Sequence, residues 1–199
     1  MNPNDVKRQW AERSGEYSPE YYAYYGPDEA SELLRRTLAS YFGSDPAILE
    51  LGCSSGRHLA HLHEHGFSDL SGVEINDEAV AVMERTYPEL ADDATVYVDA
   101  IEDVLAGFED DRFDAVYSVE TLQHIHPDNA WVFEDVTRVA SDLLLTVENE
   151  GDGEESVNYV RDEFPLYYRD WRAVFAEFDC REVESERLKR DTFRAFRPA

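Results

Sequence analysis

The chain has 199 residues, of which 43% are hydrophobic, and this is enough for one domain with a sizeable core. Its 44 Asp and Glu residues against 18 Lys and Arg give a net charge of −26, which disfavours nucleic acid as a partner because phosphate binding depends on clustered cations. No apolar run of about 18 residues is present, so no membrane-spanning segment is expected.

The acidic residues are spread along the whole sequence, and only Lys7 and Lys189 are lysines. Such a surface repels itself in dilute buffer, whereas at molar salt the screening length falls to roughly 3 Å. The composition resembles that of proteins from salt-accumulating (halophilic) cytoplasms; an acidic surface for a basic partner is the alternative. The N-terminus lacks the apolar core of a signal peptide, and Cys53 and Cys180 lack metal-type spacing, so a cytoplasmic location is expected.

Residues 1–43 are expected to form a Tyr-rich lid segment and a helix packed on the core. Within residues 1–27, five tyrosines follow no single helical face: Tyr17, Tyr21, Tyr22, Tyr24 and Tyr25. Each ring has an apolar body and a polar tip, so the segment can cover a pocket; alternatively, the rings only dock the N-terminus onto the core. An amphipathic stripe then predicts a helix over 28–42.

From residue 44 to residue 199, strands and helices alternate and indicate one α/β domain. Strands are predicted over 47–51, 69–75, 95–98, 113–119, 142–147, 180–188 and 191–197, and helices over 57–65, 77–86, 101–106, 128–140 and 168–178. Residues 148–155 are predicted to form an acidic loop. Repeated strand–helix units predict a doubly wound parallel sheet with helices on both faces, and the two final strands predict an antiparallel hairpin.

Three features fall at the expected carboxyl ends of successive strands, where a doubly wound sheet binds its ligands. A turn from Gly52 to Gly56 follows the first strand, Glu74 ends the second, and Asp99 follows the third. Gly52 and Gly56 permit a ligand to approach the backbone closely. Glu74 can accept hydrogen bonds from both ribose hydroxyls, and Asp99 can accept one from an adenine amine. Each feature alone has the alternative explanation of a turn or a helix cap. Together they predict an adenosine-type ligand rather than a dinucleotide, whose Gly-x-Gly-x-x-Gly spacing is absent.

These features lie in segments that resemble class I S-adenosylmethionine-dependent methyltransferases. Residues 48–59 (ILELGCSSGRHL) resemble motif I of that family, 72–76 (GVEIN) its acidic second-strand motif, 99–103 (DAIED) its adenine-contacting segment and 113–125 (FDAVYSVETLQHI) its fourth-strand motif. The resemblance covers residues 44–199 and implies a Rossmann-like sheet of seven strands, mostly parallel, with the last inserted strand antiparallel. It departs from the family pattern at Ser54, where a glycine is common.

The resemblance also implies S-adenosyl-L-methionine as the cofactor and a role for each matched position. Glu50, Gly52, Ser54 and Gly56 are implied to surround the methionine moiety, and Glu74 to hold the ribose. Ile75, Asp99 and Ala100 are implied to contact the adenine, and Ser118 and Val119 to line the site below the sulfonium. His124 and His126, after the fourth strand, are candidate general bases, since histidine titrates near neutrality. The alternative for His124 is that it contacts the cofactor or orders the loop. Tyr25 is a further candidate catalytic residue, expected not to act as a base but, with its neighbours, to close the pocket and exclude water.

We therefore expect an enzyme that transfers a methyl group from S-adenosylmethionine to a small-molecule acceptor, with neither nucleic acid nor membrane as partner. Two alternatives stay open, a nicotinamide-dependent reductase and a non-catalytic module that binds S-adenosylmethionine. The tract His58, His61, His63 and His65 suggests a metal, but no Cys or spaced carboxylate completes a site, so a solvated helix face is expected instead. Neither the acceptor nor the oligomeric state is predicted.

Overall fold

A computed structural model describes residues 1–14, 18–43, 45–151, 156–160 and 164–199. Tyr17 and residues 152–155 of the predicted acidic loop lie outside the described residues.

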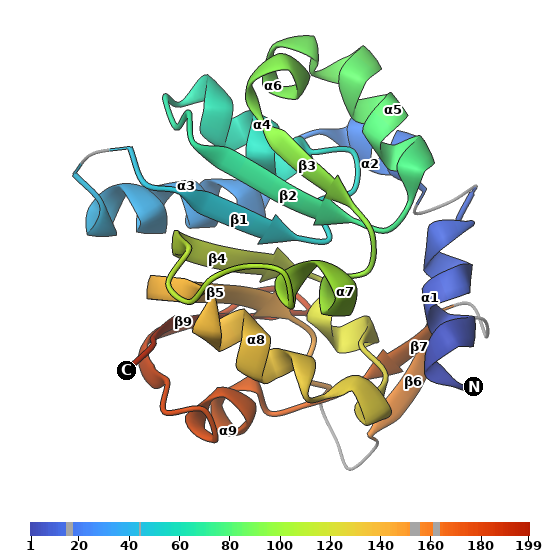
Figure 1. Cartoon of the computed structure of the whole chain (residues 1–199), viewed down its shortest axis with the longest axis vertical. Coiled ribbons are helices and arrows are strands. Elements are labelled where there is room, and N and C mark those ends of the chain that lie inside the picture. Colours follow the sequence, from blue (N-terminus) through green and yellow to red (C-terminus); the bar gives the residue numbers. More distant parts are fainter. Residues whose placement is uncertain (15–17, 44, 152–155, 161–163) are drawn as a thin grey trace.

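A seven-stranded sheet forms the centre of the molecule, in the strand order β3-β2-β1-β4-β5-β9-β8 (Figure 1). The strands are β1 (Ile48–Leu51), β2 (Leu70–Glu74), β3 (Thr95–Val98), β4 (Phe113–Val119), β5 (Ala140–Glu148), β8 (Arg181–Arg187) and β9 (Thr192–Arg197). The first five are parallel, while β9 runs antiparallel between β5 and β8. The doubly wound, mostly parallel sheet and its C-terminal hairpin are therefore confirmed.

Helices cover both faces of the sheet, because successive residues of a buried strand point to opposite sides. Figure 1 shows α3 to α6 in the upper half of the view and α7 to α9 in the lower half, and the two groups contribute to different apolar cores, one on each face of the sheet. The upper helices are α3 (Glu29–Tyr41), α4 (Arg57–Glu64), α5 (Asp77–Thr86) and α6 (Pro88–Asp93); the lower ones are α7 (Ile101–Leu105), α8 (Val132–Arg138) and α9 (Trp171–Ala176). In β1, Ile48 belongs to the upper apolar core and Leu49 to the lower one.

The structure contains elements that the sequence did not predict. Two short helices, α1 (Pro3–Ala11) and α2 (Pro19–Tyr25), precede α3, and β6 (Val157–Val160) pairs with β7 (Phe164–Tyr167) in a separate two-stranded sheet. Each helix has a proline in its first turn and an N-cap side chain, Asn2 or Ser18, that accepts a backbone N–H. The helix expected over 128–140 begins later, at Val132, after two 3₁₀ turns, Leu122–His124 (η1) and Pro127–Asn129 (η2).

The strand order reverses between β1 and β4, whose neighbours β2 and β5 lie on opposite sides. The loops that follow these two strands therefore diverge, and a crevice opens beyond their carboxyl ends. Figure 1 shows α1 and the β6–β7 hairpin at this same end of the sheet.

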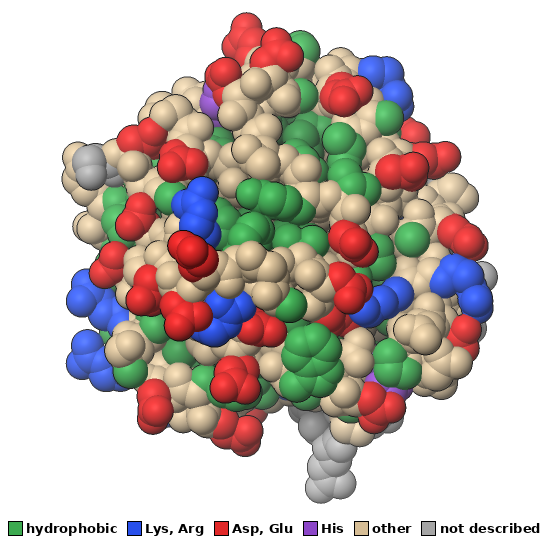
Figure 2. Space-filling view, viewed as in Figure 1, with side chains coloured by type: hydrophobic (Ala, Val, Ile, Leu, Met, Phe, Trp, Pro, Cys, Tyr) green, Lys and Arg blue, Asp and Glu red, His purple; other side chains and the backbone are tan. Residues whose placement is uncertain are grey.

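Charge is distributed broadly over the molecule. Figure 2 shows Asp and Glu side chains scattered over the whole of the visible face, with Lys and Arg at fewer places between them. Within the described residues, no helix is long and apolar enough to cross a membrane.

Candidate functional site

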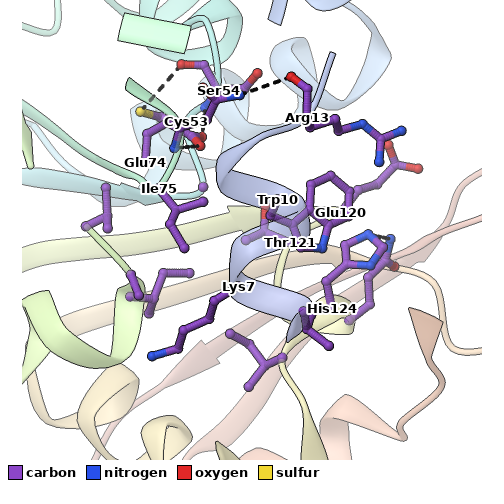
Figure 3. Close-up of a pocket in the computed structure, with 18 of the residues that line it drawn as sticks. Lys7, Trp10, Arg13, Cys53, Ser54, Glu74, Ile75, Glu120, Thr121 and His124 are labelled. Carbon is purple, nitrogen blue, oxygen red and sulfur yellow. Dashed lines mark hydrogen bonds between the residues drawn. The ribbon is translucent and has the colours of Figure 1, made fainter. Parts of the chain in front are cut away.

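A cavity of about 260 Å³ lies beyond the carboxyl ends of the parallel strands. The residues after β1, β2, β3 and β4 reach it from the sheet, and α1, α2 and the β6–β7 hairpin contribute from outside (Figure 3). Of the predicted residues, those that line it are Gly52, Ser54, Glu74, Ile75, Asp99, Ala100, Val119, His124 and His126. Four separate stretches of sequence thus meet at one place.

The turn after β1 depends on left-handed backbone conformations. Gly52 has φ +74° and Gly56 has φ +77°. A Cβ at position 52 would overlap the Thr121 side chain, and one at 56 would lie 2.8 Å from Met83 Cε, so both positions require glycine. Ser54 also has a left-handed φ of +50°, which explains why glycine is common at this position in the resembling family.

Glu74 joins the turn after β1 to the start of α5. Its Oε2 accepts the Ser54 N–H at 2.7 Å, and its Oε1 accepts the Asn76 N–H at 2.8 Å. Burial raises the pKa of this carboxyl, while the backbone N–H donors lower it. Each carboxylate oxygen has a second lone pair, so Glu74 can still accept hydrogen bonds from a ligand in the cavity.

The third strand brings Asp99 and Ala100 to the cavity wall. Asp99 Oδ1 accepts the Ala100 N–H at 2.8 Å, which fixes the carboxylate at the start of α7. Ile75 lies on the same wall and supplies an apolar surface (Figure 3). A carboxylate beside an aliphatic side chain suits a flat heterocycle with an amine at its edge.

Three predicted residues lie behind the cavity wall rather than on it. Glu50 is 1% exposed and accepts the Tyr117 hydroxyl at 2.9 Å, and burial raises its pKa well above the ordinary value. Ser118 is fully buried and donates to Glu148. Gly56 packs against Met83. All three support the loops that line the cavity and do not face it.

His124 belongs to η1 and lines the cavity beside α1. Its Nδ1 lies 2.9 Å from the Pro165 carbonyl, which only accepts hydrogen bonds, so Nδ1 carries the proton and Nε2 is the acceptor. The side-chain amide nitrogen of Gln123 lies 3.5 Å from this Nε2. Burial lowers the pKa of His124 to about 4. The ring is therefore neutral near pH 7 and acts as a hydrogen-bond acceptor rather than a strong base. His126, the second candidate base, is bonded through Nε2 to the Met1 carbonyl at 2.9 Å.

The first helix contributes an aromatic wall. The Trp10 ring lies 4.4 Å from the His124 ring and 4.9 Å from the Phe164 ring, centroid to centroid, and the Arg13 guanidinium lies 4.5 Å from the Trp10 centroid. Figure 3 shows Trp10 and His124 side by side, on α1 and on η1. Lys7 of the same helix forms ion pairs with α7, at 3.5 Å to Glu102 and 3.2 Å to Asp103.

Tyr25 does not line the cavity among the described residues, and its side chain is 63% exposed. Tyr22 of the same helix lines the cavity instead, beneath the guanidinium of Arg57 at 4.9 Å from its ring centroid. Burial raises the pKa of Tyr22 to about 12. Of the tyrosines of α2, Tyr22 is therefore the one that reaches the cavity.

The histidine tract forms the expected solvated face only in part, because His58 is buried whereas His65 is exposed. His58 is 5% exposed and its Nδ1 lies 2.7 Å from Ser31 Oγ, whereas His61 and His63 contact Glu32 and Asp93. Burial lowers the pKa of His58 to about 3. Across the described ranges, no three His, Cys, Asp or Glu side chains gather where they could hold a metal ion.

Sequence reasoning missed two charged residues, Glu148 at the end of β5 and Arg169 before α9. Glu148 accepts backbone N–H groups from the loop after β4, and Arg169 donates to backbone carbonyls of the same loop. Neither residue lies in a recognisable motif. Only the position of Glu148 at a strand's carboxyl end pointed toward the site.

Residues 48–142 match the sequence model of a family described as a methyltransferase domain. The chain has no match among curated proteins. Among solved structures, it is similar to an S-adenosylmethionine-dependent methyltransferase from Methanosarcina mazei, with a TM-score of 0.68 and 21% identity over 81% of this chain and 96% of that one.

Two further structures share the fold and contain ligands. The 1,6-didemethyltoxoflavin-N1-methyltransferase of Burkholderia thailandensis, with 1,6-didemethyltoxoflavin and S-adenosylhomocysteine bound, has a TM-score of 0.69 and 16% identity over 86% of this chain and 79% of that one. Magnesium protoporphyrin IX methyltransferase from Synechocystis PCC 6803, with S-adenosylmethionine bound, has a TM-score of 0.67 and 13% identity over 98% of this chain and 91% of that one. The chain thus has the Rossmann-like fold of these methyltransferases.

Proposed function

We propose that this chain is an S-adenosylmethionine-dependent methyltransferase that acts on a small molecule. One observation carries the proposal. The Glu74 carboxylate, at the end of β2, binds the Ser54 amide in the turn after β1, on the wall of the cavity that Asp99 and Ala100 reach from β3. This is the arrangement that an adenosine moiety requires at the switch point of a doubly wound sheet. The match of residues 48–142 to a methyltransferase domain supports the same conclusion.

The cofactor is S-adenosyl-L-methionine, which supplies an electrophilic methyl group when bound. Glu74 holds the ribose hydroxyls, and Ile75, Asp99 and Ala100 hold the adenine. The turn around Gly52 and Ser54 would receive the methionine end, and Val119 would line the site beside the reacting methyl group. Glu50, Gly56 and Ser118 support these loops from behind. The residues present therefore fit the cofactor.

Methyl transfer needs an acceptor lone pair aligned with the sulfur–methyl bond, so the main task of the protein is positioning. His124 offers Nε2 as a hydrogen-bond acceptor to a hydroxyl or amine of the acceptor, and so orients it. Trp10 and Tyr22 cover the cavity and reduce the access of water. Tyr25 takes no part in this arrangement, because its ring is exposed.

The size of the cavity favours a small acceptor, and so does the fact that only short elements, α1, α2 and the β6–β7 hairpin, cover it. The anionic surface disfavours DNA and RNA. The Burkholderia relative in fold carries a small heterocyclic acceptor, which illustrates what such a cavity can hold. We place the reaction in the cytoplasm, where Cys53 and Cys180, both buried and free, stay reduced.

The two alternatives make different predictions. A nicotinamide-dependent reductase would need a turn suited to a pyrophosphate, and the Gly52–Gly56 spacing does not provide one. A non-catalytic module would bind the cofactor with no turnover.

A labelled-methyl screen tests the function directly. The protein, held in molar salt, is mixed with S-adenosylmethionine labelled in its methyl group and with pools of small hydroxyl, amine and carbon acceptors. We expect label to move to one pool, and His124→Ala to slow that transfer about tenfold or more through the lost hydrogen bond. Cofactor binding without transfer to any pool would favour the non-catalytic module.

A further inference from the structure

The loop after β4 carries six residues that line the cavity: Glu120, Thr121, Gln123, His124, Ile125 and His126. A loop that must place a side chain relative to a reacting methyl group needs its backbone fixed, because misplacement of about 1 Å costs on the order of 100-fold in rate. The backbone of this loop is bound on two sides by charged side chains that do not line the cavity themselves.

Glu148 binds the amide side of the loop. Its Oε1 accepts the N–H groups of Thr121 at 3.2 Å and Leu122 at 3.0 Å, and its Oε2 accepts that of Gln123 at 3.2 Å. Ser118 adds a hydroxyl donor to Oε1. Glu148 is fully buried, and an ionised carboxylate in such a place is retained only where donors surround it.

Arg169 binds the carbonyl side of the same loop. Its Nη2 donates to the Ile125 carbonyl at 2.6 Å, and its Nη1 to the Leu122 carbonyl at 3.3 Å. The guanidinium lies 5.3 to 5.6 Å from the ring centroids of Phe133, Tyr167 and Trp171. Burial lowers its pKa to about 10, while the nearby Glu148 carboxylate raises it, so the two charges act on each other as well as on the loop.

His124 is thereby fixed both through its backbone and through its ring. Its backbone N–H donates to the Thr121 carbonyl at 2.9 Å, within the stretch that Glu148 holds. Its Nδ1–H donates to Pro165 on β7, four residues before Arg169 in the chain. Rotation of the ring would break the bond to Pro165, and movement of the loop would break those to Glu148 and Arg169.

We propose that Glu148 and Arg169 are positioning residues that hold residues 121–125 from opposite sides and act on methyl transfer through His124. The inference rests on the proposed function of the site. Neither side chain reaches the cavity, so both act by fixing where Nε2 of His124 points.

The first test needs neither cofactor nor turnover. In Glu148→Gln, the amide group turns one acceptor into a donor that faces a backbone N–H, so the loop loses part of its support. Amide hydrogen exchange of Leu122 and Gln123 in the free protein should become about tenfold faster or more. Exchange in β1 should stay unchanged, which shows that the variant is folded. Equal exchange of the loop amides in both proteins would overturn the proposal.

The second test is a double-mutant cycle with His124→Ala. Alone, Glu148→Gln and Arg169→Lys should each lower kcat about fivefold or more, while the Kd for S-adenosylhomocysteine changes less than about twofold. In the His124→Ala background, both should lower kcat little further, because they act through the missing ring. Full additive losses in that background would contradict the proposed route.

Two matched variants control for general loss of stability. Arg138→Lys alters a guanidinium that also donates to two backbone carbonyls, Phe108 at 2.7 Å and Leu105 at 2.9 Å, but away from the cavity. Glu182→Gln alters a carboxylate of β8 that pairs with Arg194 of β9. Both should keep the kcat of the unaltered chain. If the unaltered chain transfers no methyl group, the proposed function fails, whereas the exchange experiment still decides whether Glu148 holds the loop.

Discussion

At the scale of single residues, the turn after β1 combines conformational strain with function. Ser54 holds a left-handed φ of +50° while its N–H binds Glu74 at 2.7 Å. A side chain in this conformation costs roughly 1–2 kcal/mol, and the bond to Glu74 keeps the residue there. The departure of the sequence from the glycine of the resembling family is thus a conformational cost and leaves the backbone donor in place.

The strain at position 54 predicts that Ser54→Gly stabilises the protein. Relief of the strain is partly offset by the greater freedom of glycine in the unfolded chain, so the free energy of unfolding should rise by up to about 1 kcal/mol. Urea denaturation at constant high salt measures the change. Ser40→Gly, inside α3, is the matched control and should destabilise instead, by about 0.5–1 kcal/mol. A loss of stability in Ser54→Gly would show that position 54 is unstrained.

The residues that line the cavity along the strand ends could be predicted, since Gly52, Glu74 and Asp99 occur in order within recognisable segments. Glu148 and Arg169, which support the loop after β4, could not be predicted. Glu148 is one of 44 acidic residues, and its role depends on the three amides that the fold brings to it. Arg169 depends likewise on carbonyls more than 40 positions away in the chain. Tyr25 was predicted in place of Tyr22 because the irregular spacing of the tyrosines did not reveal which side of α2 faces inward.

At the scale of elements, the parallel strands were predictable and the cover of the cavity was not. Buried strands are apolar runs bounded by turn residues, and β3 and β4 have the predicted bounds. By contrast, α1 buries only Val6 among its residues, so its sequence shows little of the periodicity that identifies a helix. The β6–β7 hairpin contains Pro165, which is unusual in a strand and is tolerated here in a two-stranded ribbon.

The position of α1 predicts a specific effect of its tryptophan. Trp10 contacts His124 and Phe164 and closes one side of the cavity, so Trp10→Ala should lower turnover about tenfold while the Kd for S-adenosylhomocysteine changes less than about threefold. Trp131→Ala, at a side chain that is 53% exposed, is the matched control and should behave like the unaltered chain. Equal kinetics in both variants would mean that α1 does not shape the acceptor site.

At the scale of the whole molecule, we expect the excess of acid to govern the conditions under which the fold persists. With 44 acidic residues against 18 basic ones, repulsion is long-ranged in dilute buffer and short-ranged at molar salt. We expect folded structure at molar KCl and its loss on dialysis to millimolar salt, followed by circular dichroism. Sucrose at matched viscosity, in place of salt, should not preserve the fold to the same degree. Full stability in dilute buffer would contradict a halophilic adaptation.

Buried Glu148 predicts how stability depends on pH. Burial raises its pKa from 4.5 to about 7, although Ser118 and the three backbone amides oppose the rise, and the Arg169 guanidinium stays charged throughout. A raised pKa means that the folded state holds the proton more tightly. This contribution is therefore complete below about pH 4.5 and is lost as the pH rises through 7, by up to about 3 kcal/mol.

Denaturation of the unaltered chain and of Glu148→Gln at pH 5, 6, 7 and 8 measures this contribution at constant salt. The unaltered chain should lose more free energy of unfolding than the variant between pH 5 and pH 8. Other buried carboxyls, such as Glu50 and Asp191, titrate in both proteins and cancel in the difference. Parallel curves would show that Glu148 keeps the same charge across this range.

The central claim is that the cavity at the switch point binds S-adenosylmethionine through Glu74, and calorimetry in molar salt tests it most directly. S-adenosylhomocysteine should bind with one site per chain and NAD should not. Glu74→Ala should weaken that binding by roughly 1–3 kcal/mol because the ribose loses its hydrogen bonds. Asp77→Ala, which removes an acidic residue from the first turn of α5, should leave the affinity unchanged. Binding of NAD in place of S-adenosylhomocysteine, or equal affinity in Glu74→Ala, would contradict the account.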